Sequence, residues 1–244
     1  MMERYLKTIN ELLGEITRHE QNKLEYVAEK IADTIPKGAV VHLFGAGHSH
    51  ILSEDVFYRA GGLVPINPIL DENLMLHNGA LRSSRLERMS NYAHTFMESQ
   101  DIQEGEVFIV FSNSGRNGVP IDVALYAKNK QAFVVGVTSM QYSVKYPSRH
   151  VSGKKLYEVV DVYIDNHCPP GDALFQFEGL QEPYFPGSTI AGSFIIQSIL
   201  AMAIEKMVEK GYTPPILVSG NIDGADMHNK KLIEKYKRRI IYYY

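Results

Sequence analysis

The residues with the clearest chemical potential lie in the stretch Ser112-Asn113-Ser114-Gly115-Arg116-Asn117-Gly118. It follows a short apolar run, 107–111, that has the length and content of a buried strand. A proline two residues past the stretch suits the first turn of a helix, where its missing N–H does no harm. Free N–H groups and the positive end of that helix would point at the turn, and its Ser and Asn side chains add donors. The pattern predicts a phosphate site, although Ser, Asn and Gly also make ordinary turns.

Two further loops carry residues of the same kind. Gly45-Ala46-Gly47-His48-Ser49-His50 follows one expected strand, and Thr138-Ser139 follows another. Ligands of parallel sheets bind beyond the carboxyl ends of the strands, where the strand order reverses. We therefore expect these two loops and the 112–118 turn to converge on one site.

The elements that must position these loops alternate between strand and helix. Alternation of this kind predicts a parallel sheet covered by helices on both faces, hence an α/β protein. Strands are expected at 39–44, 63–66, 107–111, 132–137 and 159–164, and helices at 3–34, 51–60, 81–99, after 118, at 190–210 and at 225–241. The segments 67–80, 140–157 and 166–188 are expected to be irregular. The predicted division is an N-terminal helical extension over 1–36, a domain over 37–220 and a C-terminal helix over 221–244.

Composition narrows the class of protein. The chain has 244 residues, 45% hydrophobic and 22% charged, with a formal net charge of −3. That charge gives no field that would recruit nucleic acid or an anionic membrane. A single cysteine, Cys168, allows no intrachain disulfide and suits a reducing compartment. No signal peptide is evident, and polar residues interrupt the longest apolar run, 190–208, so no membrane span is expected. The expected location is the cytoplasm.

Taken together, the loops Gly45-x-Gly47-x-Ser49, Ser112-x-Ser114-Gly115 and Thr138-Ser139 resemble the SIS (sugar isomerase) phosphosugar-binding domain family. The likeness covers roughly 20–210 and is closest to a subgroup with GAGHSH, FSNSGRNGVPID and DNHCPPGDA stretches. It implies a three-layer αβα sandwich with a five-stranded parallel sheet in flavodoxin-like order. It also implies a sugar phosphate on the SNSG loop, and a homodimer or homotetramer with sites near subunit contacts.

Carrying over catalytic residues from related groups largely fails. The phosphoheptose isomerase and N-acetylmuramic acid 6-phosphate etherase groups place a Glu where this chain has Arg59. The isomerase group also has a His where Ile196 or Gln197 stands here. Glu87 falls near a second Glu of the etherase group. The resemblance further implies that Ser188 and Thr189, at a helix start, contact substrate as in the etherases, although the etherase Lys is absent.

Several side chains near the loops are candidates for proton transfer. Glu87 and Glu72 are the carboxylates expected to act as base next to a carbonyl, and His48 is expected to contact sugar or phosphate. The predicted binding residues are Gly47, Ser49, Ser112, Asn113, Ser114, Gly115, Asn117, Thr138, Ser139, Ser188 and Thr189. Arg59 is expected to serve as a charge partner or a second phosphate clamp.

Other chemistries remain as alternatives. A metal site could combine His48 and His50 with residues of the 167–172 loop, but no closed ligand spacing exists, so no metal is expected. A dinucleotide site on Gly45-x-Gly47 lacks its third Gly, and no cofactor is expected. The function indicated is an isomerase acting on a sugar phosphate or amino-sugar phosphate. The alternatives are a non-catalytic phosphosugar sensor, and a lyase or etherase on an N-acetylhexosamine 6-phosphate.

Overall fold

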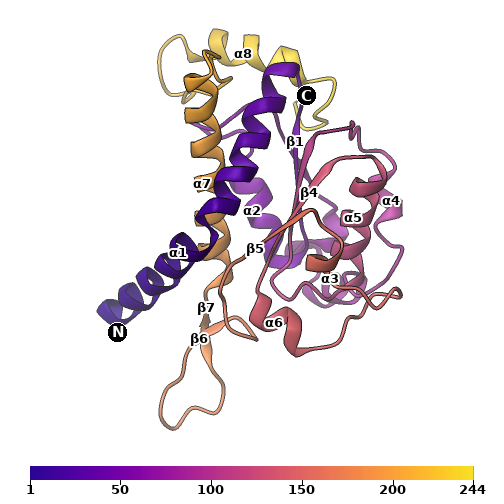
Figure 1. The fold of residues 1–244 in the computed structure, drawn as a ribbon, viewed down its shortest axis with the longest axis vertical. Helices are drawn as coiled ribbons and strands as arrows, with labels where there is room; N and C mark the ends of the chain where they lie inside the picture. The colour runs from indigo at the N-terminus through magenta and orange to yellow at the C-terminus, as the bar shows by residue number, and fades with distance from the viewer. Residues whose placement is uncertain (244) are drawn as a thin grey trace.

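A computed structural model describes residues 1–243 of the chain. Its centre is a five-stranded, all-parallel sheet in the order β2-β1-β3-β4-β5 (Figure 1). The strands are β1 (Val41–Gly45), β2 (Ile66–Ile69), β3 (Val107–Phe111), β4 (Phe133–Thr138) and β5 (Val162–Asp165). The predicted fold class, sheet size and flavodoxin-like strand order are therefore confirmed.

Two helical layers cover the sheet because alternate strand residues point to opposite faces. Val107, Ile109 and Phe111 of β3 pack with α1 (Met2–Thr34), α2 (His50–Asp55) and α7 (Ser188–Glu209). Phe108 and Val110 face the other way, toward α4 (His94–Met97) and α5 (Gly118–Asn129). Near-continuous apolar strands are what a sheet buried on both faces requires.

Several predicted bounds are wrong. β2 starts at Ile66 rather than at 63, because Leu63 instead forms an isolated antiparallel bridge with Ile216. Pro68 lies inside β2, which the edge position of this strand permits. The helix predicted over 51–60 is α2 alone, which ends at Asp55.

The single helix predicted over 81–99 is also wrong. It is divided into α3 (Ala80–Leu86) and α4, separated by a turn in which Asn91 has φ +70°. The Asn91 N–H donates to the Asp122 carboxylate of α5 over 2.5 Å, so a distant side chain fixes this turn.

The 140–157 segment contains α6 (Met140–Lys145), and the loop predicted over 166–188 contains a hairpin of β6 (Ala173–Phe175) and β7 (Tyr184–Pro186). Short 3-10 helices fill other turns, at Ile35–Lys37, Gly47–Ser49, Glu72–Leu74, Leu76–Asn78 and Leu156–Glu158.

The C-terminal segment covers the amino edge of the sheet. It contains α8 (Ala225–Tyr236), which ends five residues earlier than predicted, and lies at the top of Figure 1. Arg239 reaches Glu106, just before β3, with Nη1–Oε1 at 2.6 Å. Glu106 also accepts from the His42 ring over 2.9 Å. The amino edge is thus closed by a buried charged network, and the carboxyl edge is left for ligands.

One helix in the described part of the chain, α7, is long and apolar enough to cross a membrane by length and composition alone. Core helices meet the same criterion. Ala191, Ile195, Ile199 and Ala203 of this helix are buried in the cluster that α1 and the sheet complete. The polar residues in its sequence therefore do not take α7 below this criterion. Its packing is that of a core helix.

Candidate functional site

The strand order places the two principal loops side by side. β1 and β3 are hydrogen-bonded neighbours, with Gly45 opposite Phe111 at their carboxyl ends. The helices that follow these strands leave on opposite faces of the sheet, so this is the switch point of a flavodoxin-like order. The Gly47–Ser49 turn and the 112–118 turn consequently open toward the same space.

A narrow cleft lies at this point, and it contains six of the predicted site residues: His48, Ser49, Ser112, Asn113, Ser188 and Thr189. Leu52, Phe111 and Val137 form its apolar floor. Its enclosed space is about 10 Å³, enough for about one water molecule. A ligand larger than a single small group must therefore extend out of the cleft toward solvent.

The 112–118 turn presents hydroxyl groups that no protein group occupies. Within residues 1–243, the side-chain oxygens of Ser49, Ser112 and Ser114 have no hydrogen-bond partner. Asn117 is the N-cap of α5 but makes no side-chain cap bond. The Val119 N–H donates to the Glu87 carbonyl over 3.0 Å and Pro120 has no N–H, so among the first three helix residues the Gly118 N–H is left without a partner in the described chain. Free hydroxyls beside an uncapped helix N-terminus are a suitable environment for an anion.

Gly115 shows why this turn needs a glycine. Its φ is +58°, which L side chains rarely adopt, and a Cβ there would lie 2.5 Å from the Ser143 hydroxyl and 2.7 Å from that of Thr138. The turn is thus folded directly onto the loop after β4. Gly47 has the same φ of +58°, but a Cβ there would meet only Leu76, at an ordinary contact distance of 3.9 Å.

Thr138 and Ser139 are fully buried and do not line the cleft. The Ser139 N–H donates to the Asn113 carbonyl over 2.9 Å, and the Thr138 hydroxyl lies 3.3 Å from the same oxygen. The Ser139 hydroxyl in turn accepts from the Tyr142 N–H and caps α6. In this structure the two residues hold the 112–118 turn in place.

Asn166 is a cleft residue that the sequence analysis missed. It directly follows β5, and its side-chain amide donates to the Asn113 side chain over 2.9 Å. Its position after a strand of the same sheet was an available signal. The strand was expected to end at residue 164, so Asn166 was placed in the loop that follows and was given no role of its own.

The start of α7 is fixed by Asp172. This carboxylate accepts from the Ser188 N–H over 2.8 Å and from its hydroxyl over 2.6 Å. Ser188 is therefore already engaged, whereas the neighbouring Thr189 hydroxyl has no partner among residues 1–243. Asp172 itself has φ +68°, a conformation uncommon outside glycine.

Glu87 contacts the 112–118 turn at Asn117, near the end of the turn that leads into α5. Its Oε1 accepts from Asn117 Nδ2 over 3.0 Å, and Asn117 Oδ1 accepts from Arg149 over 3.0 Å. Burial raises the pKa of Glu87, and the Asn117 hydrogen bond together with the charges of Arg88 and Arg149 only partly offsets it. Glu87 thus has the environment of a general base, although it is not among the cleft residues.

The other candidates for chemistry are more distant. Glu72 is exposed on the 3-10 turn Glu72–Leu74 and does not line the cleft. Arg59 is exposed and pairs with Asp55, the last residue of α2, four positions earlier in the chain. His48 is exposed at the cleft rim.

The groups proposed for the metal alternative are separated by their packing. His50 Nδ1 bonds to the Gly47 carbonyl, and His167 lies 3.5 Å from Glu20 of α1. Cys168 is buried, and burial raises the pKa of its thiol. Among residues 1–243 no three His, Cys, Asp or Glu side chains gather as a metal site would require.

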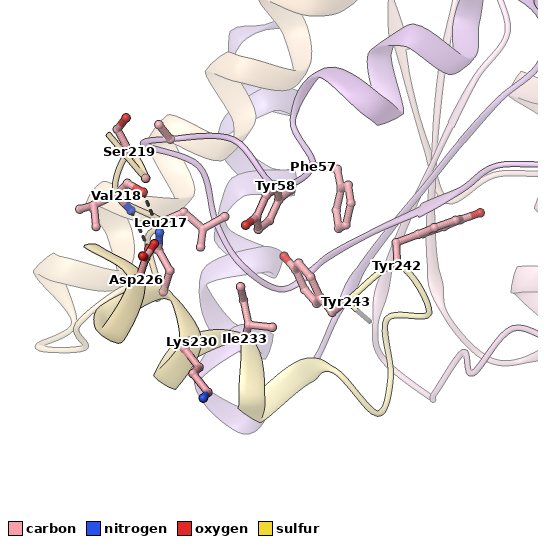
Figure 2. Close-up of a pocket in the computed structure, with 13 residues that line it drawn as sticks. Phe57, Tyr58, Leu217, Val218, Ser219, Asp226, Lys230, Ile233, Tyr242 and Tyr243 are labelled. Atoms are coloured by element: carbon pink, nitrogen blue, oxygen red, sulfur yellow. Dashed lines mark hydrogen bonds between the residues drawn. The ribbon is translucent and has the colours of Figure 1, made fainter. Parts of the chain in front are cut away.

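A larger cavity of about 640 Å³ lies away from these loops, between the end of α2 and α8. Figure 2 shows Phe57, Tyr58 and Tyr243 facing one another there, and the Phe57 and Tyr243 ring centroids are 5.2 Å apart. None of the predicted site residues lines it.

Comparison with known proteins supports the assignment drawn from these loops. The SIS domain profile matches residues 4–139. The chain belongs to the SIS-domain family. A UPF0309 protein of Halalkalibacterium halodurans is 55% identical over 240 residues, covering 98% of this chain and 96% of that protein. A UPF0309 protein of Caldanaerobacter subterraneus is 42% identical over 243 residues, with 98% and 99% covered.

Solved structures show the same fold. A phosphoheptose isomerase from Francisella tularensis matches with a TM-score of 0.56 at 10% identity, covering 84% of this chain and 96% of that one. The phosphoheptose isomerase from Neisseria gonorrhoeae gives 0.53 at 13% identity, with 84% and 95% covered. At these identities the likeness concerns the fold alone, and it agrees with the family expected from the three loops.

Proposed function

We propose that this protein binds a sugar phosphate at the 112–118 turn and acts as an isomerase on a sugar phosphate or amino-sugar phosphate. The observation that carries the proposal is the set of side-chain hydroxyls of Ser49, Ser112 and Ser114, which no group of residues 1–243 engages, together with the Gly118 N–H at the start of α5. Hydroxyl and N–H donors of this kind can donate to the oxygens of a phosphate. The enclosed cleft has room for about one water molecule, so the phosphoryl group would lie at its mouth against these donors and the sugar would extend toward solvent.

Family membership and the two phosphoheptose isomerases among the structural neighbours support this substrate class and reaction class. Aldose–ketose isomerisation begins with removal of a proton next to a carbonyl. Glu87 supports such a step because burial raises the pKa of its carboxyl, which makes it a better base near neutral pH. The proposal therefore assigns phosphate binding to the beginning of the turn, at Ser112 and Ser114. It assigns proton transfer to Glu87, which contacts the other end of the turn at Asn117.

A non-catalytic phosphosugar sensor is the second candidate. No carboxylate occurs among the residues that line the cleft in the described part of the chain. A sensor needs only the phosphate site and a means of transmitting occupancy. Substrate-dependent exchange of a carbon-bound proton with solvent distinguishes the two, since a sensor catalyses none.

The test of phosphate binding is isothermal calorimetry with glucose 6-phosphate and fructose 6-phosphate, each compared with its free sugar. Ser114→Ala should weaken binding of the phosphates by about 1–3 kcal/mol, the scale of a hydrogen bond to a charged group. Ser99→Ala is the matched control, because Ser99 is exposed before β3 at the opposite edge of the sheet. Equal affinity for a sugar and its phosphate would refute the proposal.

A further inference from the structure

Three arginines, Arg88, Arg116 and Arg149, gather at the far end of the 112–118 turn. We call them the arginine cluster. The Arg149 N–H donates to the Arg116 carbonyl over 2.8 Å, and Arg149 Nη1 donates to the Asn117 side chain over 3.0 Å. Arg88 directly follows Glu87, whose carboxylate bonds to the same Asn117. Three segments distant in sequence thus bring three arginines to this end of the turn, close enough for the charges of Arg116 and Arg88 to act on Arg149.

The charges of the cluster are only partly compensated, since the Glu87 carboxylate acts on Arg88 and Arg149 without forming an ion pair with either. None of its guanidinium groups lies within 4.0 Å of a carboxylate in the described residues, although Arg239 and Arg59 elsewhere are paired in this way. The Nε of Arg116 is buried and has no hydrogen-bond partner there. Its guanidinium also lies 5.4 Å from the centre of the Tyr146 ring, which limits its freedom to move into solvent.

The cluster is held in place by buried polar contacts. His150, next to Arg149, bonds through Nε2 to Asp122 of α5 over 2.8 Å, and both side chains are at least nine-tenths buried. Burial and the charges of Arg116 and Arg88 lower the pKa of Arg149, so the three cations repel one another. Holding them together costs free energy that a bound anion would offset.

The cluster and the cleft lie at opposite ends of the same turn. Ser112 and Asn113 line the cleft, whereas the cluster surrounds Asn117. A phosphate bound by the hydroxyls at the near end leaves the guanidinium groups for another part of the ligand. Planar guanidinium groups recognise carboxylate and phosphate oxygens in paired hydrogen bonds.

We propose that the arginine cluster binds a second anionic group of the ligand, so that the preferred ligand is a sugar phosphate that also carries a carboxylate or a second phosphate. This inference rests on the proposed function, because it assumes that the first phosphate occupies the 112–118 turn. It narrows the substrate class from sugar phosphates in general to those with two separated anions.

The experiment measures affinity by calorimetry for two matched ligand pairs on the full chain. Glucose 6-phosphate is compared with 6-phosphogluconate, and fructose 6-phosphate with fructose 1,6-bisphosphate. We expect the doubly anionic member of at least one pair to bind about tenfold or more tightly. The pair that shows this preference identifies the second anion as carboxylate or phosphate.

The variants are Arg88→Gln and Arg149→Gln, with Lys130→Gln as control. Lys130 is exposed at the opposite end of α5. Each arginine variant should abolish most of the preference while changing affinity for the single phosphates less than about twofold, and the control should change neither. Arg88 makes no hydrogen bond through its side chain in the described residues, so its loss should leave folding intact.

Equal affinity within both pairs would overturn this inference alone. So would arginine variants that weaken single and double anions alike, since the arginines would then bind the same phosphate as the turn. Failure of every sugar phosphate to bind would overturn the proposed function and, with it, this inference.

Discussion

The side-chain amide of Asn117 donates to the carboxylate of Glu87 over 3.0 Å, although the two residues are 30 positions apart. Asn117 is also the N-cap residue of α5 and belongs to the 112–118 turn that we assign to phosphate. A ligand bound at the turn would therefore lie beside Asn117, and Asn117 bonds directly to a carboxylate whose pKa is raised by burial. This contact links the proposed binding site to the proposed base.

Glu87→Gln should abolish substrate-dependent deuterium exchange from solvent while leaving ligand binding intact. Loss of a positioned base is expected to cost about 10²–10⁴-fold in rate. Glu72→Gln is the parallel variant, and it should retain exchange if Glu87 is the base. Exchange is followed by NMR with each sugar phosphate that binds. Retention of exchange by both variants would place the base on another residue.

The pH dependence of kcat/KM should also report whether Glu87 is the base. A base must be deprotonated, so activity should fall as pH drops through the pKa of Glu87, which burial raises above its ordinary value of 4.5. The Asn117 hydrogen bond lowers this pKa, so Asn117→Ala should move the acid limb to higher pH. An acid limb unmoved by the variant would argue that another group titrates.

Gly115→Ala should destabilise the protein and weaken phosphate binding. The new methyl group would lie 2.5 Å from the Ser143 hydroxyl at a backbone angle of φ +58°, and we expect a cost of about 1–3 kcal/mol. Gly153→Ala is a useful control because Gly153 also has positive φ, of +72°, but open space around it. Thermal unfolding measures both variants. Equal losses would show that backbone strain alone, and not the contact with Ser143, makes Gly115 necessary.

Acid should detach the C-terminal segment. Burial alone would raise the pKa of Glu106, but hydrogen bonds from His42 and Arg239 outweigh it and hold the pKa at about 2. A carboxyl with a depressed pKa stabilises the fold at pH above its unfolded value of 4.5, and this contribution is lost as pH falls from there toward 2. The loss is on the order of 3 kcal/mol. Chemical unfolding across this pH range should show it.

Glu106→Gln should remove most of this pH dependence and lower stability at neutral pH, because it leaves the Arg239 charge without its buried partner. Glu104→Gln, at an exposed neighbouring position, should behave as wild type. A Glu106→Gln profile as steep as that of wild type would assign the acid sensitivity to other groups.

The protein should form at least a dimer at micromolar concentration. The enclosed part of the cleft is about 10 Å³, so most of a sugar phosphate would need walls beyond those that one chain provides. Exposed apolar side chains, including Leu6 of α1 and Phe177 and Leu180 beside the β6–β7 hairpin, are available for contact. Light scattering measures the mass. A monomer with full ligand affinity would contradict the prediction.

The sequence alone determined the α/β class of the sheet and the position of the turn that we assign to phosphate. Apolar runs with the length of buried strands recur along the chain, and their carboxyl ends carry Gly, Ser and Thr. This information is local, because hydrophobic periodicity and turn chemistry act over a few residues. It correctly gave an α/β sheet with Ser49 and Ser112 after the carboxyl ends of two strands, and the resemblance of these loops to the SIS family implied the order that makes the two strands neighbours.

The tertiary structure decided which distant groups surround that turn. Asn166 joins Asn113, Asp172 fixes Ser188, and Arg149 reaches Asn117 only because separate loops fold onto one edge of the sheet. The divided helix over 81–99 has the same origin, since its break is held by Asp122 of another element. Such contacts depend on how long loops dock, and neither spacing nor composition encodes that docking. For this reason the position of the 112–118 turn at the sheet edge could be predicted from the sequence, whereas the arginine cluster beside it could not.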